Sequence, residues 1–193
     1  GGDVVVTAGA TASGSSGGQV TITSGSGTTS SSGDIVLQTA ASALNAGTSG
    51  AILMSTGQAN GNNGGDILLR SGASTNSNTA NGRGGDIKLT VGSGVSGTGG
   101  DIILSAGAMA SPTGTGGEVS ITTGSGTAKT SGDMFLLTGV GGSGGASGAI
   151  HMSSGVATNG PSGALAIGSG TTTSGSGGSI TMTVGSGLSL IHI

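Results

Sequence analysis

The sequence contains no cysteine, no tryptophan and no tyrosine, and its single aromatic residue is Phe135. Without cysteine, the chain can form no disulfide and offers no thiolate to a metal ion. With one aromatic ring, it lacks both the large side chains that usually fill a globular core and a row of rings on which nucleic-acid bases could stack. The composition therefore argues against a conventional packed domain.

Charged residues are also few, with four basic and seven acidic side chains among 193 residues. The basic residues, Arg70, Arg83, Lys88 and Lys129, are too few to form a surface that binds a phosphate backbone. No apolar run reaches the about 18 residues of a membrane-spanning helix, and no signal-peptide pattern opens the chain. We therefore expect no nucleic-acid partner and no membrane span.

Residues suited to catalysis are nearly absent. His151 has no carboxylate in its own stretch of sequence to orient it, and a catalytic triad or metal site would need a further histidine or a cysteine nearby. No Gly-x-x-x-x-Gly-Lys phosphate-binding loop occurs. We expect no enzymatic activity, no cofactor and no catalytic or metal-binding residues.

What the sequence does contain is a repeat rich in glycine, serine and threonine. Its unit reads glycine, an acidic or small residue, Ile or Val, any residue, Leu, Ile or Met, any residue, a small residue and glycine. Twelve copies begin 15 to 20 residues apart, at Asp3, Gln19, Asp34, Ala51, Asp66, Asp86, Asp101, Glu118, Asp133, Ala149, Ala164 and Ser179. This spacing is typical of a solenoid.

Apolar residues alternate within each unit, which predicts a strand with one buried face. The residues expected to point inward are Val4, Val6, Val20, Ile22, Ile35, Leu37, Ile52, Met54, Ile67, Leu69, Ile87, Leu89, Ile102, Leu104, Val119, Ile121, Met134, Leu136, Ile150, Met152, Leu165, Ile167, Ile180 and Met182. The glycine-rich segments between strands are expected to form the corners. We predict an all-β fold, a parallel β-solenoid of twelve strand-turn units over residues 1–187.

The units alternate in length and in the residue expected to point outward, so we favour coils of about 31 residues with two strands each. One coil per unit of about 15 residues is the alternative. In one class of unit the outward residues are apolar. This outer column comprises Val5, Val36, Leu68, Ile103, Phe135, Leu137 and Ala166. A continuous apolar stripe usually marks an interface, so we expect self-association, with another copy or a related solenoid chain.

The other class of unit carries hydroxyl groups. This hydroxyl column comprises Thr21, Thr23, Ser55, Thr90, Ser120, Thr122, Ser153, Thr181 and Thr183. It resembles the Thr-x-Thr arrays of insect antifreeze solenoids, which implies ice binding or binding to another surface. Leu53, Lys88 and His151 interrupt one rank of the array, and ordinary stacking of exposed threonines is the alternative.

All seven acidic residues occupy the first position of a unit: Asp3, Asp34, Asp66, Asp86, Asp101, Glu118 and Asp133. The pattern loosely resembles the calcium-binding repeats of RTX β-rolls. Five units lack an acid, and most lack the Gly-x-Gly that precedes the aspartate in those repeats. We therefore do not expect calcium to bind, and interpret the acids as solvated groups that accept hydrogen bonds from corner N–H groups and discourage aggregation.

The style of the repeat over residues 1–187 resembles that of Gly/Ser/Thr-rich solenoid proteins on the surfaces of microbial eukaryotes and of bacterial adhesins. This resemblance implies a structural subunit of an extracellular filament, hair or cell-surface appendage. A protein that binds ice or another surface is the alternative.

The last six residues, 188–193, break the repeat with the sequence Leu-Ser-Leu-Ile-His-Ile. They resemble a translation of an adapter used in sequencing libraries. We expect this segment to be an assembly artefact and the chain to be a fragment of a longer array. A genuine apolar cap is the alternative.

Overall fold

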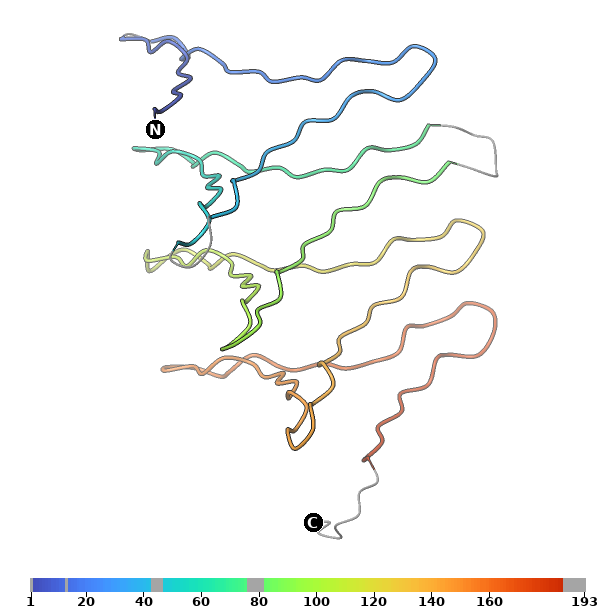
Figure 1. The fold of residues 1–193 in the computed structure, drawn as a ribbon. Helices are drawn as coiled ribbons and strands as arrows, with labels where there is room; N and C mark the ends of the chain where they lie inside the picture. Colours follow the sequence, from blue (N-terminus) through green and yellow to red (C-terminus); the bar gives the residue numbers. More distant parts are fainter. Residues whose placement is uncertain (1, 13, 43–46, 76–81, 186–193) are drawn as a thin grey trace. The chain divides into compact units, whose positions relative to one another are not determined.

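The structure is a computed structural model that describes residues 2–12, 14–42, 47–75 and 82–185. Within these residues it contains no helix and no strand, so no bounds of such elements can be given. The ribbon in Figure 1 accordingly shows neither coiled ribbons nor arrows, only extended stretches joined by loops. The chain divides into two units, Gly1–Ile102 and Ile103–Ile193, which we describe separately.

The predicted parallel β-solenoid is therefore wrong for this chain. Among the described residues, the main-chain hydrogen bonds join residues at most 13 positions apart, and all of them lie in loops or turns. A strand needs a second extended segment bonded alongside it. In the part of the chain that the structure describes, the apolar segments have the alternation of strands but no such neighbour, so neither a sheet nor a coil of one or two strands forms there.

The expected interior is missing for the same reason. No hydrophobic residue is buried in the described part of the chain, and all 24 side chains that we expected to point inward are exposed to solvent. The expected inward and outward residues differ only in how strongly they are exposed: Ile35 is 59% exposed, whereas its neighbour Val36 is 74% exposed. An extended segment can shield one face of a side chain locally, but only a second segment could bury it.

Regular structure appears instead in the loops between the apolar segments. In the unit Gly1–Ile102 the N–H of Gly18 donates a hydrogen bond to the carbonyl oxygen of Gly9, with N and O 2.8 Å apart. Gly33 donates to Gly25 in the same way at 3.0 Å, and Gly85 donates to Gly72 at 3.0 Å. In each case the glycine that precedes one repeat unit bonds to the seventh residue of the unit before it, so the two ends of the loop meet.

The second unit, Ile103–Ile193, repeats this arrangement. Gly117 donates to Gly107 at 2.9 Å, and Gly132 donates to Gly124 at 3.0 Å.

The prediction that glycine supplies positive φ between the apolar segments is confirmed in six loops, which contain Gly14, Gly61, Gly97, Gly144, Gly160 and Gly175. At positive φ the Cβ of an L-residue clashes with the main chain. Glycine has no Cβ, so it allows the chain to reverse at each of these positions.

Candidate self-association surface

A close approach of the two loop ends recurs at all eleven junctions between units, and at five of them the main-chain hydrogen bond accompanies it. We call each close approach a neck, formed by the glycine before a unit and the sixth residue of the unit before it. A methyl group added to that glycine would meet the sixth residue at 2.8–3.7 Å. The pairs are Gly18 with Ala8, Gly33 with Ser24, Gly50 with Thr39, Gly65 with Thr56, Gly85 with Ser71, Gly100 with Val91, Gly117 with Ala106, Gly132 with Thr123, Gly148 with Thr138, Gly163 with Ser154 and Gly178 with Ser169.

The necks explain why a glycine precedes each repeat unit. The main chain can approach a neighbouring residue this closely only where no side chain intervenes. At the neck of Gly65 a side chain adds a bond, because the hydroxyl of Thr56 donates to the carbonyl oxygen of Gly65 at 3.1 Å. Sequence analysis placed these glycines at corners but did not predict that each meets the sixth residue of the unit before it, although both positions recur in the repeat.

The apolar segments between necks carry the outer column. Val5, Leu68 and Ile103 are 80%, 69% and 84% exposed, and Phe135 is 78% exposed. Val36, Leu137 and Ala166 are exposed as well. The column's members lie in separate segments, apart from Phe135 and Leu137. Each segment therefore offers its apolar residues to solvent individually.

The hydroxyl column is exposed throughout: Thr21, Thr23, Ser55, Thr90, Ser120, Thr122, Ser153, Thr181 and Thr183 all face solvent. These residues also lie in separate extended segments, with no sheet beneath them to align their hydroxyl groups. The expected flat sheet is absent from the described residues, so binding of ice or of another surface stays a prediction.

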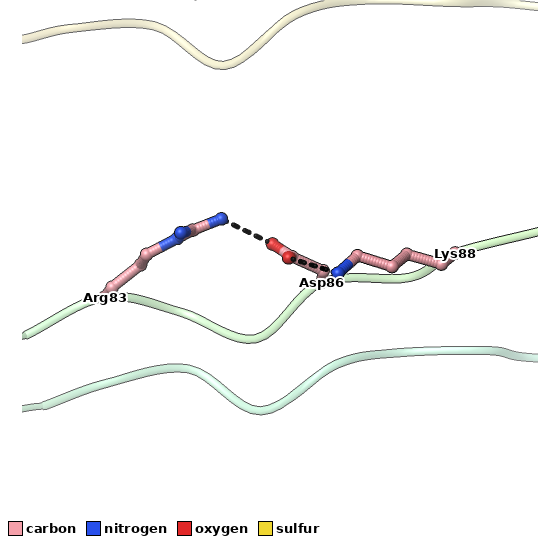
Figure 2. Close-up of polar contacts among 3 residues, drawn as sticks. All are labelled: Arg83, Asp86 and Lys88. Atoms are coloured by element: carbon pink, nitrogen blue, oxygen red, sulfur yellow. Dashed lines mark hydrogen bonds and ion pairs between the residues drawn. The ribbon is translucent and has the colours of Figure 1, made fainter.

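The acidic residues differ in whether they have an ion-pair partner. At Asp86 both carboxylate oxygens have a cationic partner: Oδ1 lies 2.9 Å from Nη2 of Arg83, and Oδ2 lies 3.5 Å from Nζ of Lys88 (Figure 2). Arg83 and Lys88 are 83% and 80% exposed, so water screens both pairs and they contribute little to stability. The expected hydrogen bonds from corner N–H groups to the carboxylates do not occur among the described residues.

No site for chemistry is assembled in the part of the chain that the structure describes. It encloses no pocket, and it brings together no group of three histidine, cysteine or acidic side chains that could hold a metal ion. His151 is exposed. No helix of the length and apolarity needed to cross a membrane occurs there either. The segment 188–193 lies outside the described residues.

No protein-family model, no curated protein and no solved structure matches the chain. The surface to be explained is therefore the one that the chain itself presents, a succession of exposed aliphatic segments separated by closed, polar loops.

Proposed function

We propose that the chain is a structural subunit of an extracellular filament or surface appendage, and that it self-associates through its outer column. One observation carries the proposal: the described residues bury no hydrophobic side chain, although aliphatic residues recur in all twelve units. Exposed apolar surface on this scale is a feature of proteins that associate.

The amount of exposed surface supports the same proposal. The chain exposes 18933 Å², whereas a compact monomer of its mass would expose about 7,800 Å². The chain alone therefore buries about a quarter of the surface that its extended form would expose, compared with about two thirds for a folded domain. Hydrophobic burial is the main favourable term in folding and association, so association with other copies is the available source of stabilisation.

The extracellular location rests on the style of the repeat and on its low charge. Repeated units allow an array of any length, and alternating apolar and polar segments allow one chain to lie against another along its whole length. Neither catalytic nor nucleic-acid-binding chemistry is required for such a role.

The proposal is tested with the full chain, by sedimentation and negative-stain electron microscopy over a range of concentrations. We expect filaments above a critical concentration, and a higher critical concentration when Val36 and Ile103 of the outer column are replaced by serine. Val95, which is 106% exposed in a loop, provides the control: Val95→Ser removes an exposed valine outside the column. A monodisperse monomer at all concentrations, or equal effects of the column and control substitutions, would contradict the proposal.

A further inference from the structure

The main chain of the apolar segments lacks hydrogen-bond partners within the described residues, just as their aliphatic side chains lack burial. Main-chain hydrogen bonds in the described residues involve loop glycines and the turn residue Ser111, and none joins the central residues of an apolar segment. These N–H and C=O groups therefore bond to water while the chain is alone. Extended segments with unpaired main-chain groups and alternating apolar side chains are templates for pairing with another chain.

A second copy of this chain fits the template best. The surface in excess of a compact monomer is about 11,000 Å², whereas one partner in a standard interface loses about 800 Å². A small ligand or a single short peptide could cover only a fraction of it. A second copy presents apolar segments of the same length at the same spacing of 15 to 20 residues, so many segments can pair at once.

We infer that neighbouring copies bind through main-chain hydrogen bonds between their apolar segments, which buries the aliphatic side chains of both copies. This inference rests on the proposed function and names the mode of its self-association. The loops stay outside the pairing, because each neck brings the two ends of its loop together, and at five necks the glycine already donates a main-chain hydrogen bond within its own loop, as Gly33 does to Gly25. Pairing is thereby restricted to the segments between necks, such as residues 19–23 and 118–122.

The test uses the full chain and three central positions of apolar segments, Thr21, Ser120 and Thr181. Replacing all three by proline removes three N–H donors while leaving every aliphatic residue in place, and proline is compatible with an extended main chain. The triple alanine variant of the same positions is the matched control, because it loses the same hydroxyl groups but keeps the N–H donors. We measure the critical concentration, the amide I infrared band and the fibre diffraction of the assemblies.

We expect assemblies of the unmodified chain to show a spacing of about 4.8 Å between paired chains and an amide I band of hydrogen-bonded extended segments. The proline variant should raise the critical concentration at least about tenfold, and the alanine variant should change it little. Assemblies without the spacing, or equal behaviour of the two variants, would overturn the inference but leave the proposed filament intact. If the unmodified chain forms no assembly, the proposed function fails and this inference with it.

Discussion

The N–H of Gly132 donates a hydrogen bond to the carbonyl oxygen of Gly124 at 3.0 Å, and it closes a loop of the same design as the one between Gly25 and Gly33. Both loops follow the pattern Gly-Ser-Gly-Thr, and both begin at the seventh residue of a unit. Because they belong to different repeat units, their common geometry follows from the local sequence. The closed loop is the structural element that the repeat encodes.

The claim that the local sequence encodes the closed loop can be tested first at Gly126. A methyl group on Gly126 would collide with the carbonyl oxygens of Lys129 and Thr130, whereas one on Gly124 would meet nothing within 4 Å. We expect Gly126→Ala to open the loop and to raise the amide exchange rate of Gly132 about fivefold, the loss of one hydrogen bond. Gly124→Ala should leave that rate nearly unchanged, and equal effects of the two variants in exchange measured by NMR would argue against a closed loop.

Loop length should matter less than segment length. The necks are alike although the residues they join lie 9 to 14 positions apart, as at Gly33 and Ser24 and at Gly85 and Ser71. Two residues inserted between Gly126 and Lys129 should therefore leave assembly unchanged, since closure entropy grows slowly with loop length. One residue inserted after Ser120 would turn the following aliphatic residue to the other face. We expect only the second insertion to raise the critical concentration. An unchanged critical concentration with both insertions would contradict pairing through the apolar segments.

Calcium should not bind at Asp86, because both oxygens of its carboxylate already face cations. Titration calorimetry with calcium should give the same heat for the unmodified full chain and for Asp86→Asn. Asp34→Asn, at the same position of another unit, is the control. Binding that is lost with Asp86 alone would show that calcium displaces Arg83 and Lys88.

The hydroxyl column gives a prediction that separates the two functions considered. A filament subunit needs no aligned hydroxyl groups, so we expect the full chain to show no thermal hysteresis. Replacing Thr21 and Thr181 by valine should accordingly leave freezing behaviour unchanged. Thermal hysteresis that is lost in this variant would favour ice binding over a filament.

Sequence analysis identified the repeat and the positions of its loops, because glycine and alternating aliphatic residues leave a local signature. The unit that begins at Asp34 shows this: the closed loop of Gly25 and Gly33 precedes it, and Ile35 and Leu37 take part in none of the main-chain hydrogen bonds of the described residues. Both residues that meet at each neck also have fixed positions in the repeat, as the glycine before a unit and the sixth residue of the unit before it. Their pairing was missed because we interpreted glycine as a corner residue rather than as a point of contact.

The predicted sheet failed because alternation specifies a strand only in the presence of a partner. Residues 34–38 have the pattern of a half-buried strand, but burial of Ile35 requires another segment at its side. That requirement involves residues distant in sequence, and nothing in the alternation decides whether the second segment comes from the same chain. The outer column that includes Val36 and Ile103 stays a prediction from its pattern, while the exposure of Ile35 beside Val36 was not foreseen.

Amide hydrogen exchange of the dilute, monomeric chain tests most directly whether its apolar segments lack main-chain partners. We predict that residues 19–23, 34–38 and 118–122 exchange as fast as an unstructured chain, because no main-chain bond protects them. Slow, cooperative exchange in these segments at a concentration where the chain is monomeric would contradict the account.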